Sequence, residues 1–374
     1  MALRFKVLAI GVAGLLAVVT AMTPSAQAGP PASFFGVNAV SPTGEDFRRM
    51  GSGGLGSYRV TLFWQEIQRE RGGELFWRAT DELFRDMAET GLKPFPILYG
   101  TPQFVGKRLQ RRIKPPVRNA ADRREWRRFI KGAIERYGKG GAFWSENPEL
   151  VDPKVRYWQI WNEQNAEFYW NPRPRPKEYA RLLKISDRAA RRADPAARLV
   201  LGGMYGYPGS RRALYARKFL NQLYRQPKVK RYFEGVAVHP YGGSLADVRR
   251  QLRAARTVMR RNGDGRTGLW VSESGWSTEG DPRNFLVVSE GAQRRKLLRT
   301  MELYLDQRKR WRIRAAFWFV WRDYPEPGAC PWCGGAGLLE RDGDSKPAWK
   351  AYKRLIKRSS SSTNLPAAAS RLGS

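Results

Sequence analysis

Two glutamates lie at the ends of strand-like stretches of this sequence, and a pair of carboxylates placed in this way can cleave a glycosidic bond. Glu163 follows residues 157–161 after one asparagine, and Glu273 directly follows residues 268–272. In such cleavage, one carboxyl group protonates the leaving oxygen while the other attacks the sugar or activates water. Either glutamate alone is consistent with a solvated acid at a strand end. The two together, with tryptophan and asparagine around them, favour a catalytic pair.

The composition restricts the other chemistries open to the chain. Its 374 residues include one histidine, His239, which excludes a multi-histidine metal site. Any histidine-dependent nucleophile must use this same residue. Two cysteines are too few for a four-cysteine zinc site. We therefore expect chemistry carried by carboxylates, with no metal ion and no cofactor.

Apolar runs of strand length alternate with amphipathic segments of helix length along the chain. In residues 126–137 the apolar side chains recur at helical spacing. Pro176 suits a first helical position, and Ser244 with Asp247 predicts a capped helix start. Such alternation predicts a parallel sheet covered by helices on both faces. The eight expected strands are residues 34–40, 57–64, 93–99, 155–161, 198–204, 235–239, 268–272 and 315–321.

Eight such units close most simply into an α/β fold of one domain, a (β/α)8 TIM barrel, with an open doubly wound sheet as the alternative. In a barrel, functional groups gather at the carboxyl ends of the strands. Strands four and seven lie nearly opposite each other, so Glu163 and Glu273 are expected to face one cavity. A G-x-G-x-x-G match at residues 51–56 precedes a strand instead of following one, so we interpret it as a turn.

The residues around these glutamates resemble clan A retaining glycoside hydrolases, most closely the family 5 and family 39 barrels and cellulase-like proteins. The resemblance rests on Trp-Asn-Glu-Gln-Asn at 161–165 and on Ser-Glu-Ser-Gly-Trp at 272–276. It extends through Phe-Gly-Val-Asn at 35–38 and His-Pro-Tyr at 239–241. It implies an O-glycosyl hydrolase of the β-glycosidase or endoglycanase type that acts on a poly- or oligosaccharide.

The resemblance also implies a role for each matching residue. Glu163 is the implied general acid/base and Glu273 the implied nucleophile of a double displacement. Asn162 is expected to bond the sugar 2-hydroxyl, Tyr241 to orient Glu273, and Arg59 to keep Glu273 ionised. Trp318 is favoured over Trp321 as the sugar platform. The remaining implied substrate-binding residues are Asn38, His239 and Trp276.

These roles carry geometric expectations. A nucleophilic carboxylate needs a pKa lowered by cationic or hydrogen-bonding neighbours, whereas the acid needs a raised pKa. Retention of configuration requires the two carboxyl groups to lie about 5 to 5.5 Å apart. Adjacent residues of a regular strand point to opposite faces. Asn162 and Glu163 can therefore both reach the sugar only if their strand breaks there.

The two ends of the chain predict export and a tail. Arg4 and Lys6 precede an apolar run at 7–19, and Ala-Gln-Ala at 26–28 offers a cleavage site. We expect residues 1–28 to be a signal peptide of a secreted, extracellular protein, with an uncleaved anchor as the alternative. Residues 29–357 are expected to form the catalytic barrel and residues 358–374 a disordered tail.

Export permits a disulfide. Cys330 and Cys333 form a C-x-x-C pair in the loop expected after strand eight. A redox motif of this spacing is expected at a helix start of a βαβ unit instead. We therefore predict a disulfide that closes a tight loop beside the cavity, rather than a redox pair or metal-bound thiols.

The net charge of +34 arises from 68 lysines and arginines against 34 acidic residues. Most of these cations are spread over helix faces, which is typical of a solvated surface. Residues 107–114 follow strand three, and Arg173 and Arg175 follow strand four. Cationic loops at these places suit an anionic glycan or a cell-envelope polymer, and the export signal argues against nucleic acid. A non-catalytic glycan-binding barrel and a polyanion-binding envelope protein are the alternatives to a hydrolase.

Overall fold

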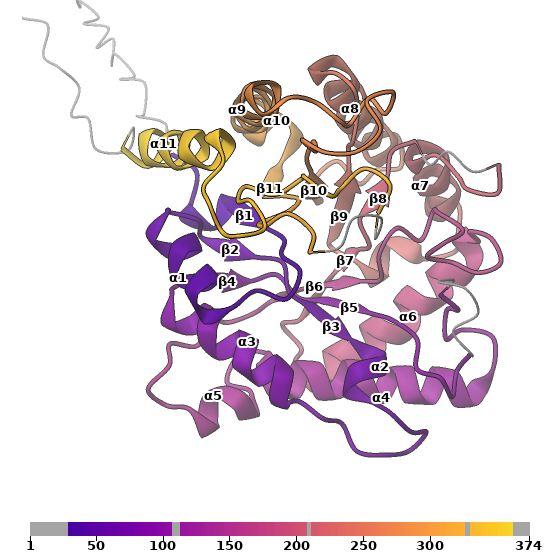
Figure 1. Ribbon diagram of the computed structural model, residues 1–374. Helices are drawn as coiled ribbons and strands as arrows, with labels where there is room; N and C mark the ends of the chain where they lie inside the picture. Colours follow the sequence, from indigo (N-terminus) through magenta and orange to yellow (C-terminus); the bar gives the residue numbers. More distant parts are fainter. Residues whose placement is uncertain (1–28, 107–112, 208–210, 326–329, 362–374) are drawn as a thin grey trace, which may run out of the picture.

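A computed structural model describes residues 29–106, 113–207, 211–325 and 330–361. These residues form a parallel sheet that curls into a barrel, with helices around its outside (Figure 1). The strands are β1 (Phe35–Val37), β2 (Ser57–Tyr58), β3 (Thr61–Phe63), β4 (Lys93–Pro94), β5 (Ile97–Tyr99), β6 (Tyr157–Ile160), β7 (Arg198–Leu201), β8 (Met204–Tyr205), β9 (Gly235–His239), β10 (Gly268–Ser274) and β11 (Ile313–Trp318). The helices are α1 (Gly44–Ser52), α2 (Trp64–Ile67), α3 (Arg78–Glu89), α4 (Ala120–Tyr137), α5 (Ala142–Glu146), α6 (Pro176–Ala193), α7 (Ala216–Tyr224), α8 (Leu245–Arg261), α9 (Glu290–Asp306), α10 (Arg308–Trp311) and α11 (Pro347–Ser361).

The strand order, in which some barrel strands are interrupted once, shows that the sheet closes. The hydrogen-bonded order is β3-β5-β6-β7-β9-β10-β11-β1-β2-β4. The strands β2 and β3 are consecutive pieces of barrel strand two, and β4 and β5 are pieces of strand three. The two ends of the order therefore belong to the same pair of barrel strands. Each of the eight expected strands overlaps an observed one, so the α/β barrel prediction is confirmed.

The barrel interior is filled by large rings that meet across it. Phe95 stacks on Trp270 and on Phe317, which come from barrel strands three, seven and eight. Such contacts between strands that are not all neighbours place these rings inside the barrel. A Cβ atom at Gly36 would lie 2.3 Å from the Phe317 ring, so only glycine leaves room for this filling. The interior is a packed core that supports the strand ends above it.

The helices that begin at Pro176 and after Ser244 start where the sequence predicts, and α4 has a cap as well. Asn119 caps α4 by accepting the Asp122 N–H, and Ser244 and Asp247 form a reciprocal capping box at the start of α8. Pro176 opens α6. The G-x-G-x-x-G match lies between α1 and β2, which confirms its interpretation as a helix-to-strand turn.

The predicted chain ends are tested only in part. Residues 1–28, the expected signal peptide, and residues 362–374 lie outside the described residues. Helix α11 continues through residues 358–361, so the predicted start of the tail is four residues too early. The buried side chains Trp349, Tyr352 and Ile356 hold this helix against the barrel. In the described part of the chain, no helix is both long and apolar enough to cross a membrane.

Candidate active site

The carboxyl end of β6 breaks as it reaches Asn162 and Glu163. The strand stops at Ile160, and both Trp161 (φ 72°) and Glu163 (φ 41°) adopt left-handed backbone conformations. Such conformations are uncommon for residues other than glycine and are held by surrounding structure. Here the Glu163 N–H donates to the Gly203 carbonyl at 3.0 Å. The break predicted for these two residues is confirmed.

Glu273 lies near the end of β10, and both of its oxygens are occupied. Arg59 Nη1 donates to Oε1 at 2.6 Å, and the Tyr241 hydroxyl donates to Oε2 at 2.9 Å. The Arg59 and Glu273 side chains are 5% and 10% exposed, so this ion pair is largely shielded from water. The geometry fixes the carboxylate in one orientation, with its charge balanced by a single guanidinium group.

Arg59 connects strand two to three other strands. It donates through Nη1 to Asn38 Oδ1 at 3.0 Å and through Nη2 to Asn162 Oδ1 at 2.8 Å. Its Nε donates to Gln159 Oε1 at 3.1 Å. Asn38 in turn donates to the Ser272 carbonyl at 3.1 Å. Arg59 and Asn38 therefore hold Asn162 and Glu273 in fixed positions relative to each other.

His239, at the end of β9, lies between the two glutamates. Its Nδ1 is 2.7 Å from Glu163 Oε1 and 3.4 Å from Glu273 Oε2, and its Nε2 is 3.0 Å from the Ser272 hydroxyl. Burial, reinforced by the nearby Arg59 charge, lowers the pKa of His239 well below its ordinary value. The imidazole is therefore neutral, with one nitrogen that donates and one that accepts. The neutral imidazole can hydrogen-bond either the protonated or the ionised form of Glu163, as donor or acceptor according to its tautomer.

The two carboxyl groups are close, and their environments differ. One oxygen of Glu163, one oxygen of Glu273 and one nitrogen of His239 lie within 4.8 Å of one another. Burial, together with the Glu273 charge, raises the pKa of Glu163 well above its ordinary value. Burial also raises the pKa of Glu273, against the opposing effects of Arg59 and Tyr241. The expected lowering of the Glu273 pKa is therefore wrong, because the desolvation of this buried carboxylate outweighs its two hydrogen bonds.

These three side chains are also the one group of histidine, cysteine, aspartate or glutamate residues in the described part of the chain that is close enough to share a metal ion. However, Glu273 already pairs with the Arg59 guanidinium. A second cation at this carboxylate would be repelled by Arg59. The donor set therefore fits proton chemistry better than metal binding.

The two tryptophans expected to contact sugar do not reach the site surface. Trp318 is fully buried and donates its indole N–H to the Ala336 carbonyl at 3.1 Å. Trp276 is 1% exposed and donates to the Gly242 carbonyl at 2.9 Å. Neither ring has a free face on which a sugar can stack, so both assignments are wrong. Trp321, the alternative platform, is also buried and bonds Asp46.

Two other aromatic rings lie beside the carboxylates. The partly exposed Trp332 ring is 4.9 Å from the Tyr241 ring and 5.9 Å from the Phe319 ring. The Phe319 and Tyr241 rings are 6.5 Å apart. Because Tyr241 bonds Glu273, Trp332 and Phe319 are the aromatic residues placed to contact a substrate next to that carboxylate.

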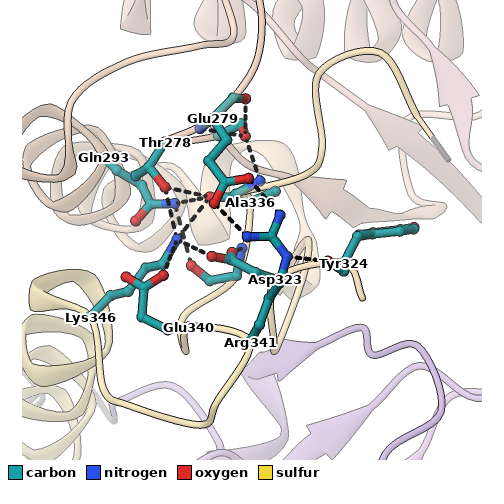
Figure 2. Close-up of polar contacts among 12 residues, drawn as sticks. Thr278, Glu279, Gln293, Asp323, Tyr324, Ala336, Glu340, Arg341 and Lys346 are labelled. Carbon is teal, nitrogen blue, oxygen red and sulfur yellow. Dashed lines mark hydrogen bonds and ion pairs between the residues drawn. The ribbon is translucent and has the colours of Figure 1, made fainter. Parts of the chain in front are cut away.

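Trp332 belongs to the long segment between β11 and α11, which a disulfide and a buried ion pair hold in place. Cys330 and Cys333 are bonded to each other, as predicted. Figure 2 shows the Lys346 ammonium group enclosed by polar groups of this segment and of the loop after β10. Lys346 Nζ lies 2.6 Å from Asp323 Oδ2, and both side chains are fully buried. Thr278 Oγ1 accepts a further bond from Nζ at 2.8 Å.

Three residues of the site were missed by the sequence analysis. Gln159 and Ser272 support Arg59 and His239, and each is a polar residue within a strand that is otherwise largely apolar. Gly203 lies so close to His239 that a Cβ atom there would be 1.9 Å from Nε2. The polar residues inside strands and the Gly-Gly pair at 202–203 were the available signals.

The structure is similar to solved glycoside hydrolases, although no family model and no curated protein matches the sequence. A family 39 glycoside hydrolase from Bacteroides cellulosilyticus is 18% identical with a TM-score of 0.62; the match covers 90% of this chain but only 64% of that one. A β-xylosidase from Caulobacter crescentus is 19% identical with a TM-score of 0.62, over 88% of this chain and 69% of that one.

A family 5, subfamily 18 glycoside hydrolase from Streptomyces cattleya, in complex with Manβ1-4GlcNAc, is 18% identical with a TM-score of 0.65. The match covers 89% of this chain and 82% of that one. This chain therefore shares the barrel fold of family 39 and family 5 glycoside hydrolases.

Proposed function

We propose that the protein is a retaining glycoside hydrolase, with Glu163 as general acid/base and Glu273 as nucleophile. The observation that carries the proposal is the pair of carboxylates at the ends of β6 and β10, with one oxygen of each within 4.8 Å of the other. This closeness supports direct attack on the sugar by one carboxylate, as in the closely spaced pair of a retaining enzyme. The shared fold adds independent support.

The different surroundings assign the roles. Glu273 meets a guanidinium and a phenolic hydroxyl, which favour the anionic form that attacks the anomeric carbon. Glu163 is buried beside that negative charge and has no cationic hydrogen-bond partner among the described residues, so its pKa is raised and its protonated form is favoured. It donates this proton to the leaving oxygen and then removes one from the water that releases the sugar.

Asn162 is placed to recognise the sugar. Its Oδ1 accepts from Arg59, which fixes the amide plane. Its Nδ2 donates to none of the described residues and is available to a hydroxyl of the sugar. A hydrogen bond from this amide to the 2-hydroxyl that strengthens in the transition state contributes to catalysis.

We infer a β-linked glycan as substrate, of a poly- or oligosaccharide. The similar structures include a β-xylosidase and an enzyme bound to Manβ1-4GlcNAc. We also infer export to the cell exterior from the signal-like residues 1–28. The bond between Cys330 and Cys333 supports this, because disulfides persist in oxidising compartments.

Covalent trapping tests the mechanism. The protein is incubated with a panel of 2-deoxy-2-fluoro glycosides that includes β-xylosides, β-mannosides and β-glucosides, and the labelled peptide is located by mass spectrometry. A label on Glu273 is the expected result, and the reactive sugar identifies the specificity. A label on another carboxylate would overturn the assignment. Turnover of unmodified glycosides with inversion at the anomeric carbon would overturn the retaining mechanism.

A further inference from the structure

The surface beside the Glu163 loop carries a groove lined mainly by cations. A hollow of about 890 Å³ lies between the start of α6, the loop before α7 and the end of α7. Seven arginines and lysines line it, against one acid, Glu178. That acid already contacts Arg118 and Arg175 at 3.5 and 3.9 Å and accepts from the Trp170 indole. The hollow therefore has a strongly positive potential.

A second hollow continues this charge along the outside of the barrel. It has a volume of about 580 Å³, lies between α4 and α6, and is lined by six arginines and lysines and Ile185. Figure 1 shows α4 and α6 side by side. Arg181 lines both hollows, so the two lie next to each other along α6, and together we call them the cationic groove. Helix α6 has 18 residues, so the groove follows a helix about 27 Å long.

The groove is joined to the candidate active site. Leu214 lines the first hollow, and its N–H donates to the Asn165 carbonyl at 2.9 Å. The Asn165 side chain donates back to the Leu214 carbonyl at 2.7 Å. Asn165 is two residues after Glu163. The first hollow therefore lies against the loop that carries Glu163.

Three cations of the groove lack acidic partners. In the described part of the chain, Lys177, Arg181 and Arg188 have no acidic side chain within 4.0 Å. By contrast Arg191, which is on α6 but lines neither hollow, contacts Asp187 at 2.7 Å and Glu234 at 3.5 Å. Unpaired cations this close together repel one another, and an anionic ligand relieves that repulsion.

We propose that the cationic groove binds an anionic polysaccharide, one that carries carboxylate or sulfate groups. Two concave hollows in a row fit an extended chain better than a flat lipid surface. Among the described residues that line the two hollows none is aromatic, whereas rings that stack on bases are typical of proteins that bind single-stranded nucleic acid. Because the first hollow lies against the Glu163 loop, this polysaccharide is also the proposed substrate, and this last point rests on the proposed hydrolase function.

Direct binding measurements test the groove separately from catalysis. The probes are polygalacturonate and dextran sulfate, with dextran as the uncharged control, and affinity is measured by titration calorimetry at low and high ionic strength. We expect both anionic polymers to bind, dextran not to bind, and affinity to fall as salt screens the cations. The variant R181Q/R188Q should bind about fivefold more weakly.

The matched control is R249Q/R253Q, which removes the same charge from exposed positions on α8. It should change affinity by less than about twofold. Equal losses of affinity in the two variants would overturn the proposal that the groove is a binding site, because non-specific charge attraction would explain the binding. Failure of both anionic polymers to bind, or binding of phosphatidylglycerol vesicles or poly(dT) in preference to them, would also overturn it.

The outcomes separate the two proposals. Polymer binding that is sensitive to R181Q/R188Q, in a protein that hydrolyses no glycoside, would retain the groove and overturn the hydrolase. Trapping of Glu273 in a protein that binds no anionic polymer would retain the hydrolase and overturn the groove.

Discussion

At the carboxyl ends of β6 and β10 every charged side chain meets a partner within hydrogen-bonding distance, whereas most cations of the groove along α6 face water. The single side chain of Arg59 contacts three residues, Glu273, Asn38 and Asn162. Arg181 and Arg188 are exposed and have no acidic partner in the described part of the chain. Burial makes each charge in the site dependent on one neighbour, because an unpaired buried charge is costly. Solvation makes each charge in the groove nearly independent of the others. We therefore expect a single substitution to have a large effect in the site, and several substitutions together to have a small, cumulative effect in the groove.

The largest expected effect is on Glu273. Glu273→Gln removes the nucleophile and keeps the shape of the side chain, so kcat should fall by about 10⁴-fold. Steady-state hydrolysis of an aryl glycoside measures it. The matched control is Glu89→Gln on the exposed face of α3, which should leave kcat within about twofold. A fall of less than about tenfold for Glu273→Gln would contradict the nucleophile assignment.

The buried ion pair between Lys346 and Asp323 tests, through the free energy of unfolding, whether a buried charge depends on a single partner. Asp323→Asn leaves the fully buried Lys346 ammonium without its 2.6 Å carboxylate partner. The free energy of unfolding should fall by about 3 kcal/mol, measured by urea denaturation. In the exposed pair between Arg78 and Glu82, Glu82→Gln should cost less than about 0.5 kcal/mol. Similar decreases in the free energy of unfolding for the two variants would show that burial does not determine the cost of breaking an ion pair.

Glu163→Gln tests whether Glu163 supplies the proton to the leaving group. A glycoside with a poor leaving group needs the proton, so kcat should fall by about 10²- to 10³-fold. A dinitrophenyl glycoside has a leaving group that departs without protonation, so the glycosylation step should be affected much less. Pre-steady-state and steady-state rates for both substrates measure the difference. Equal losses for the two leaving groups would contradict the assignment of Glu163 as general acid.

The smallest expected effect in the site is a shift in pH dependence. The Tyr241 hydroxyl lowers the pKa of Glu273, so Tyr241→Phe should raise that pKa. The nucleophile is active when ionised, so the acidic limb of kcat/KM should move to higher pH, by about one unit. Tyr207→Phe, at an exposed tyrosine, is the control and should leave the limb unchanged. An unchanged limb in Tyr241→Phe would show that this hydroxyl does not act on the nucleophile.

The barrel and the carboxylate pair were predictable because their signals are local. Alternating apolar runs and amphipathic segments follow from hydrogen-bond geometry and burial within each element, and Glu163 and Glu273 stand out because an acid at the end of a buried strand is conspicuous. The resemblance to clan A hydrolases then implied Arg59 and Tyr241 as partners of Glu273, and the structure places both on it.

The aromatic platform was not predictable in this way. Residues 315–319 are all apolar, so the sequence shows no alternation between the two faces of the last strand. In the structure Phe317 fills the barrel interior, Trp318 packs in a separate part of the core near Trp276, and Phe319 lies beside Tyr241. A shift of one residue reverses the face, so choosing Trp318 placed the ring on the wrong side.

By itself the sequence determined the barrel class and the two strand-end glutamates, because periodicity and chain order specify which residue ends each strand. Only the tertiary structure decided the charge state of the site, since the pKa values of Glu163, Glu273 and His239 depend on burial and on Arg59, which is remote in sequence. It also decided which of the many cations form a groove. The concave surface forms where α4, α6 and α7 pack together. No local pattern in the sequence predicts this packing.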